Sequence, residues 1–142
     1  MKAILFILTV TTGLAFAGSP ERARLISRAF DQAYQQWTSD VRTAATNDAQ
    51  NAAWQRRPDE VEVGRKMWEE IRNDLDKSWT LEPAAWLLVN ASTYAVKQVR
   101  KPVRRGDPDR PAGIIREAVR SNHLLSPKLG SYCIALLSLI HI

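Results

Sequence analysis

Cysteine and histidine are almost missing from this chain. Its 142 residues include one cysteine, Cys133, and two histidines, His123 and His141. A lone cysteine excludes a disulfide within the chain, so packing alone must hold the core. No His-Glu-x-x-His, paired Cys-x-x-Cys or other clustered metal-ligand spacing occurs, and the sequence therefore predicts no metal site.

Motifs for nucleotide binding and nucleophilic catalysis are missing as well. The chain has no glycine-rich nucleotide loop and no Gly-x-Ser-x-Gly elbow. We expect His123 to bond the last carbonyls of the helix before it, and Cys133 to be a buried, inert thiol. Carboxylates in the middle of the chain lie among basic residues, as on a solvated helix face rather than in a general acid/base pair. They are Glu69, Glu70, Asp74 and Asp76. The sequence predicts no catalytic residue and no cofactor.

Residues 1–17 have the pattern of a secretory signal peptide. Lys2 precedes an apolar stretch over residues 3–10, and the small residues Ala15 and Ala17 form a cleavage pattern before Gly18. The apolar stretch is too short to span a bilayer as a helix. We therefore expect export to the periplasm or the extracellular space, with no transmembrane segment in the mature chain. An N-terminal anchor or a buried helix is the alternative.

Residues 18–136 are expected to form one all-α domain, because no apolar run shows the sustained alternation of a strand. The first helix starts at the cap formed by Ser19 and Pro20. Its apolar stripe follows the helical period and comprises Ile26, Phe30, Ala33, Trp37, Val41 and Ala44. An Asn-rich stretch after Ala44 weakens this helix, which either continues or gives way to a short successor before Pro58 breaks it.

Four further helices are expected. The second begins near Asp59, and its apolar face comprises Val61, Gly64, Met67, Trp68, Ile71 and Leu75. The third is capped by Thr80 or Glu82 and is apolar almost all round, which predicts the most buried element. The fourth covers residues 112–122. The fifth begins at Ser126 and Pro127 and turns Leu129, Cys133, Leu136 and Leu137 inward.

The short connections between these helices predict antiparallel helical hairpins. Such hairpins form either a small bundle or the start of an α-solenoid, and no fixed-period repeat decides between them.

The formal net charge of +5 is spread along the chain and is not a nucleic-acid signature. One basic face stands out, since Lys97, Arg100, Lys101 and Arg104 recur at helical spacing with Arg105 beside them. This face predicts a contact for a protein partner or an anionic surface. A merely solvated helix end is the alternative.

Tryptophan is abundant, with five residues in the chain. Trp37, Trp68 and Trp86 lie on apolar stripes and are expected to fill helix–helix junctions. Trp54 and Trp79 lie near helix ends, so they are the better candidates for an exposed groove.

Two segments carry a resemblance to a known family. They are residues 81–88 (LEPAAWLL) and residues 123–130 (HLLSPKLG), the second shortly before a cysteine. Together they resemble the helical N-terminal region of exported bacterial thioredoxin-like proteins of the TlpA/redoxin kind. In that family the activity lies in a downstream thioredoxin domain, so no catalytic residue is carried over. The resemblance implies the helical scaffold or docking region of a thiol–disulfide oxidoreductase. A free-standing extracytoplasmic helical binding module is the alternative.

The last residues carry no helix stop signal. Residues 137–142 (LSLIHI) can be written as codons that resemble a transposon mosaic end used in sequencing adaptors. We therefore expect residues 137–142 to be a non-native, adaptor-derived tail and the gene to continue beyond them. A natural apolar tail packed on the bundle is the alternative.

Overall fold

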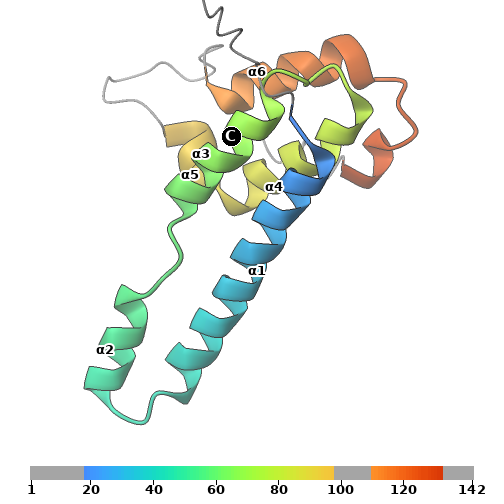
Figure 1. The fold of residues 1–142 in the computed structure, drawn as a ribbon. Helices are drawn as coiled ribbons and strands as arrows, with labels where there is room; N and C mark the ends of the chain where they lie inside the picture. The colour runs from blue at the N-terminus through green and yellow to red at the C-terminus, as the bar shows by residue number, and fades with distance from the viewer. Residues whose placement is uncertain (1–17, 98–109, 133–142) are drawn as a thin grey trace, which may run out of the picture.

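The structure is a computed structural model that describes residues 18–97 and 110–132 (Figure 1). The described residues are α-helical and contain no strand, so the all-α class predicted from the sequence is confirmed. The helices are α1 (Pro20–Thr43), α2 (Asn47–Gln55), α3 (Glu60–Ile71), α4 (Leu81–Asn90), α5 (Ser92–Lys97) and α6 (Pro111–Ala118). A 3-10 turn, η1 (Ser78–Thr80), precedes α4, and a π-helical turn, η2 (Val119–His123), extends α6.

Helix α1 begins where the sequence predicts. The Ser19 hydroxyl accepts a hydrogen bond from the Arg22 N–H at 3.4 Å, and Pro20 occupies the first turn. With 24 residues, α1 is about 36 Å long. It ends at Thr43, and Thr46 caps a separate α2 by accepting from the Ala49 N–H at 3.2 Å. The short successor helix is therefore the alternative that the structure adopts.

The C-terminal half of α1 and the antiparallel α2 form an arm that projects from the rest of the molecule (Figure 1). Among the described helices, α2 is the one that runs beside this half of α1, and most residues of this half are exposed. Ala33, predicted on the buried stripe, is accordingly exposed, whereas Ala23 and Phe30 near the other helices are buried.

The core lies where α3, α4 and α5 meet the N-terminal half of α1. Met67 and Ile71 of α3 and Leu87 of α4 are completely buried there. Helix α4 is buried over most of its surface, as predicted, although Glu82 and Val89 are exposed. Val61 was expected on the buried face of α3 but is exposed, because it lies in the first turn of that helix.

The start of α4 differs from the prediction. Thr80 occupies the N-cap position, but its hydroxyl donates to the Lys77 carbonyl at 2.7 Å and does not cap the helix. Glu82 lies inside the helix. The turn η1 already satisfies the backbone before α4, so the helix begins at Leu81, two residues before Pro83.

The C-terminal described residues form α6, η2 and a further helical stretch at residues 129–132. The prediction of a helix over residues 112–122 therefore holds in position, although its last turn is π-helical. The Ser126 hydroxyl accepts from the Lys128 N–H at 3.4 Å at the start of the expected fifth helix. Cys133, Leu136, Leu137 and the suspected tail at residues 137–142 lie outside the described residues.

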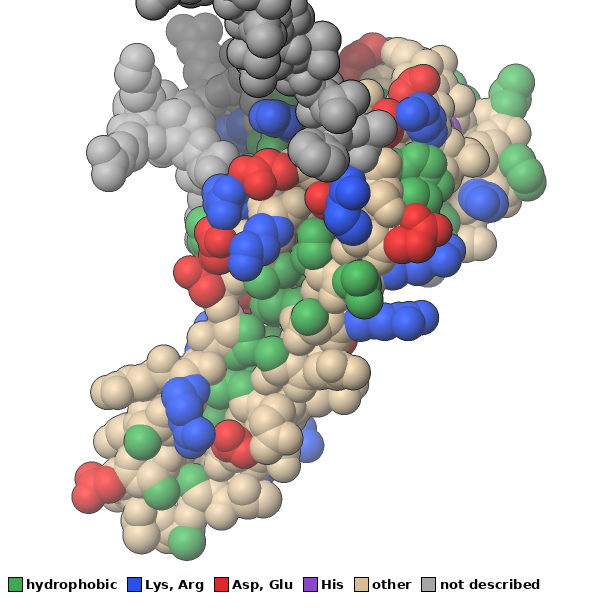
Figure 2. All heavy atoms as spheres, in the orientation of Figure 1, with side chains coloured by type: hydrophobic (Ala, Val, Ile, Leu, Met, Phe, Trp, Pro, Cys, Tyr) green, Lys and Arg blue, Asp and Glu red, His purple; other side chains and the backbone are tan. Residues whose placement is uncertain are grey.

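Helix α3 contacts α1, α4 and α5. Among the described residues, α3 is therefore the central helix. Hydrophobic side chains gather along the line where α1 faces α2 and α3, with charged side chains on either side (Figure 2). None of the helices within the described ranges is both long and apolar enough to cross a membrane.

Candidate functional site

The predicted basic face falls almost wholly outside the described residues. Lys97 is the last residue of α5, and the helical position is all that the structure gives for it. Arg100, Lys101, Arg104 and Arg105 lie in the range that is not described. The contact with a protein partner or an anionic surface stays a prediction.

His123 is buried, with 3% of its surface exposed. Its Nε2 lies 2.6 Å from the Leu75 carbonyl oxygen. Because a carbonyl only accepts, Nε2 must carry the proton and donate. The ring therefore ties η2 to the turn after α3, and the expectation that it bonds the carbonyls of its own helix is wrong. Among the described residues, no group of three or more His, Cys, Asp or Glu side chains is placed to hold a metal ion.

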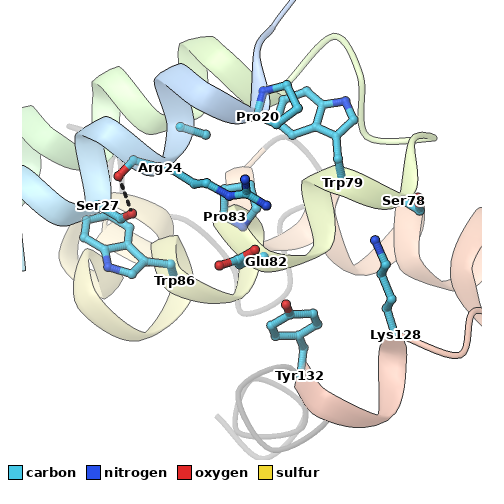
Figure 3. Close-up of a pocket in the computed structure, with 11 residues that line it drawn as sticks. Pro20, Arg24, Ser27, Ser78, Trp79, Glu82, Pro83, Trp86, Lys128 and Tyr132 are labelled. Carbon is cyan, nitrogen blue, oxygen red and sulfur yellow. Dashed lines mark hydrogen bonds between the residues drawn. The ribbon is translucent and has the colours of Figure 1, made fainter.

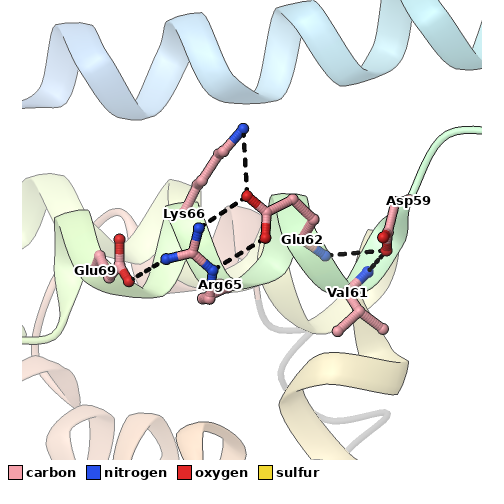
Figure 4. A network of polar contacts seen from close by, with 6 residues as sticks. All are labelled: Asp59, Val61, Glu62, Arg65, Lys66 and Glu69. Carbon is pink, nitrogen blue, oxygen red and sulfur yellow. Dashed lines mark hydrogen bonds and ion pairs between the residues drawn. The ribbon is translucent and has the colours of Figure 1, made fainter.

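The exposed face of α3 carries a network of charges (Figure 4). Arg65 pairs with Glu62 at 2.8 Å and with Glu69 at 2.5 Å, and Lys66 approaches Glu62 at 3.5 Å. The hydrogen bond from Arg65 lowers the pKa of Glu62, and the same two carboxylates raise the pKa of Arg65. A carboxylate held ionised in this way is a surface ion pair, as predicted for this face.

Asp74 does not belong to that solvated face. It is 6% exposed, and its oxygens accept from the Gly18 N–H at 2.9 Å and from Lys77 Nζ at 2.6 Å. The prediction is wrong for this residue. Asp74 lies beyond the end of α3, in a turn that contacts Gly18 just before α1.

A small cleft lies between the first turns of α1, the η1–α4 segment and the C-terminal stretch (Figure 3). Its volume is about 100 Å³, the size of one side chain. Aromatic and proline side chains form its walls: Trp79, Trp86, Tyr132, Pro20 and Pro83. Tyr132 and Lys128 project into it from the last described turn, opposite Glu82 (Figure 3).

Charge is concentrated at the mouth of the cleft. Arg24, Glu82 and Lys128 line it, and none of them takes part in the ion pairs formed within residues 18–97 and 110–132. Burial raises the pKa of Tyr132, and the negative charge of Glu82 adds to this effect while Arg24 opposes it. The cleft therefore offers a neutral hydroxyl, two cations and one anion that have no fixed partner in the described part of the chain.

A second aromatic feature, the aromatic strip, runs along the arm. It consists of Trp86, Phe30, Tyr34, Trp37 and Trp54, whose successive ring centroids are 5.0–5.9 Å apart. Arg57 lies over the Trp37 ring at 5.6 Å, within the range of a cation–π contact. The Trp37 indole nitrogen is buried and has no hydrogen-bond partner among the described residues.

The tryptophans follow the sequence prediction in part. Trp54 is 49% exposed, as expected for a residue near a helix end. Trp68, Trp79 and Trp86 are partly buried against the core, so Trp79 is less exposed than predicted. Sequence reasoning treated each tryptophan singly, and it missed that Trp79 and Trp86 share a cleft with Tyr132. The aromatic residues spaced three or four apart on α1 were a signal for the strip.

No protein-family model matches the chain, and no curated protein or solved structure matches it.

Proposed function

We propose that this chain is the non-catalytic helical region of an exported thioredoxin-like protein of the TlpA/redoxin kind, and that it docks the catalytic domain that follows it in the parent protein. The observation that carries the proposal is the cleft between the first turns of α1, the η1–α4 segment and the C-terminal stretch. Tyr132 and Lys128 of that stretch form one of its walls. The side of the molecule that offers the cleft is therefore also the side to which the C-terminal stretch belongs.

The chemistry of the cleft suits a protein contact. Trp79, Trp86 and Tyr132 present apolar area with polar edges, a combination that is enriched at protein interfaces. Arg24, Glu82 and Lys128 supply charges that can choose a partner by complementarity. The volume of about 100 Å³ accommodates one anchoring side chain rather than a small-molecule substrate.

A small contact is enough to keep the domain docked when the domain and the helical region are joined in one chain. A domain joined by a short linker has an effective concentration on the order of 1 mM near the cleft. A dissociation constant of about 1 mM, or about −4 kcal/mol, then half-fills the cleft. The separated partners are therefore expected to bind weakly, and the docked state depends on their being in one chain.

Long-read sequencing of the native locus is the first test. If the proposal is right, the native reading frame continues after the codon of Leu136 into a thioredoxin-like domain. An in-frame stop directly after Ile142 in native DNA contradicts it.

The second test measures binding of that downstream domain to the helical region by microscale thermophoresis. Replacing Trp79 with Ala removes one wall of the cleft, so detectable binding should be lost. Trp54→Ala is the matched control, because it removes a tryptophan from the arm and leaves the cleft intact. Equal binding by both variants contradicts docking at the cleft.

A free-standing extracytoplasmic binding module is the second candidate function, and the aromatic strip favours it. Trp54 is half exposed at the tip of the strip, and the Trp37 indole beside it is an unsatisfied donor. Such a module requires no downstream domain. For such a module, the two variants should have the opposite effects on binding: Trp54→Ala should weaken capture of the partner and Trp79→Ala should not.

A further inference from the structure

The first two described residues, Gly18 and Ser19, are each held by a carboxylate from another part of the chain. The Gly18 N–H donates to Asp74 Oδ2 at 2.9 Å, and the Ser19 N–H donates to Glu70 Oε2 at 3.3 Å. More than fifty residues separate each pair in sequence. The backbone just before α1 is therefore fixed to the end of α3 and the turn after it.

Asp74 is a buried carboxylate with an unusual set of partners. Its Oδ1 accepts from Lys77 Nζ, whose pKa is raised by this hydrogen bond, and its Oδ2 faces the Gly18 nitrogen. Burying a charge is costly unless it is paired and hydrogen-bonded. A peptide N–H is a neutral donor, and a charged donor at the same position would add the attraction between two opposite charges.

The space around Gly18 admits no side chain. A Cβ at this position would lie 1.8 Å from the Glu70 carbonyl oxygen and 3.1 Å from Asp74 Oδ2. Backbone oxygen cannot move aside cheaply, so the close approach requires glycine. Two acceptor groups therefore surround the nitrogen and Cα of residue 18 at short range.

We propose that Asp74 is the receptor for the α-ammonium group of Gly18, which is created when the chain is cut between Ala17 and Gly18. The inference rests on the proposed export of the chain. Hydrolysis breaks the Ala17 C–Gly18 N bond, water supplies the hydroxyl of the Ala17 carboxylate, and the Gly18 nitrogen takes up protons to become an ammonium. An α-amino group has an ordinary pKa of about 7.7–8.0, so it is charged at neutral pH. Cleavage thus replaces the neutral N–H donor to the Asp74 carboxylate by a charged one, so that the hydrogen bond becomes an ion pair and stabilises the mature fold.

The test compares two chains that differ only in their first residue, one running from Gly18 to Ile142 and the other from Ala17 to Ile142. Both are released from a fusion protein by a protease that leaves a free amine. With Asp74 intact, the Gly18 chain should have an unfolding equilibrium constant about tenfold lower, equivalent to about 1.4 kcal/mol. Retaining Ala17 moves the charge away from Asp74, so equal stability of the two chains overturns the proposal.

Removing the charge of Asp74 shows whether the stability difference between the two chains comes from the ion pair. In the Asp74→Asn background the two chains should unfold alike, because the neutral amide of Asn cannot form an ion pair with the amine. Glu69→Gln is the matched control, since Glu69 is an exposed carboxylate on α3 that pairs with Arg65. That control should keep the tenfold difference, and its loss there overturns the assignment to Asp74.

Titrating the Gly18 amine in the wild-type chain is a test that does not depend on whether any variant folds. The groups that face the amine are Asp74, Glu70 and Lys77, together with Glu21 and Arg22 of its own segment. NMR titration of ¹⁵N-labelled Gly18 should give a pKa above about 8.0, because the nearest charge is a carboxylate. A pKa at or below the ordinary range overturns the receptor.

Both tests use purified chains of defined start, so they do not depend on secretion or on a downstream domain. N-terminal sequencing of the exported protein examines the processing step separately. A mature chain whose first residue is Gly18 supports the proposed cleavage. Any other start overturns the maturation step and the proposed cleavage site, whatever is found at the docking cleft.

Discussion

Replacement of Gly64 by Ala should destabilise the fold, although alanine is the better helix former. Gly64 lies inside α3 where this helix meets α5. A Cβ there would lie 2.7 Å from Tyr94 Cβ, 2.9 Å from Ala91 Cβ and 2.9 Å from Tyr94 Cγ. Tyr94 and Ala91 are both buried, and these atoms are fixed to their backbones, so α5 itself must move.

Two opposing effects set the size of the loss. Gly→Ala inside a helix gains about 0.8–1.0 kcal/mol in helix propensity. Overpacking a well-packed core costs about 1–3 kcal/mol. Three contacts below 3.0 Å place this site toward the upper part of that range, so the net loss should be about 1–2 kcal/mol. For a domain of this size, a loss of 1 kcal/mol lowers Tm by about 4 °C or more.

Urea unfolding followed by circular dichroism measures this difference, with Gly130→Ala as the control. Gly130 lies in the helical stretch at residues 129–132, and a Cβ there meets no atom within 4 Å. The propensity gain should therefore appear alone at Gly130 and raise stability. If Gly64→Ala stabilises the protein as much as Gly130→Ala does, the close contact between α3 and α5 is refuted.

Three further predictions follow from single contacts. His123→Ala should lower the free energy of unfolding by about 1–3 kcal/mol in urea titrations, because the buried Leu75 carbonyl loses its donor; an unchanged midpoint would contradict the tie between η2 and α3. Asp59→Ala should cost about 1 kcal/mol, because its carboxylate caps α3 by accepting from the Val61 and Glu62 N–H groups, and an unchanged stability would show that this cap is dispensable. Ultraviolet titration should find Tyr132 ionising above pH 10, and Tyr132→Phe should remove that phase. Since the raised pKa favours the neutral phenol in the fold, the stability that it contributes is complete below pH 10 and lost as pH rises through the folded pKa; persistence of the phase in Tyr132→Phe would assign it to another tyrosine.

Helix starts could be predicted from sequence where the cap is local. Ser19 with Pro20 and Asp59 each satisfy backbone N–H groups two or three residues away, so a short segment contains the whole signal. Thr80 carries the same residue type, but its hydroxyl bonds back to Lys77 in η1. That competition depends on the turn after α3, which no helical periodicity reveals.

Contacts between distant segments escaped the sequence for a different reason. His123 reaches Leu75, and Gly18 reaches Asp74, across 48 and 56 residues. Periodicity shows which side of a helix is apolar but not which helix covers it. For this reason Ala33 and Val61 were expected to be buried, although no element packs closely over them. The cleft is likewise a product of packing, since its walls come from both ends of the described chain and from α4.

The tryptophan indoles test docking at the cleft most directly. The five indole N–H groups give separate NMR signals, with Trp79 and Trp86 at the cleft and Trp37 and Trp54 on the arm. On titration with the domain encoded after Leu136, the signals of Trp79 and Trp86 should shift while that of Trp54 stays in place. Shifts confined to Trp37 and Trp54 would contradict docking at the cleft.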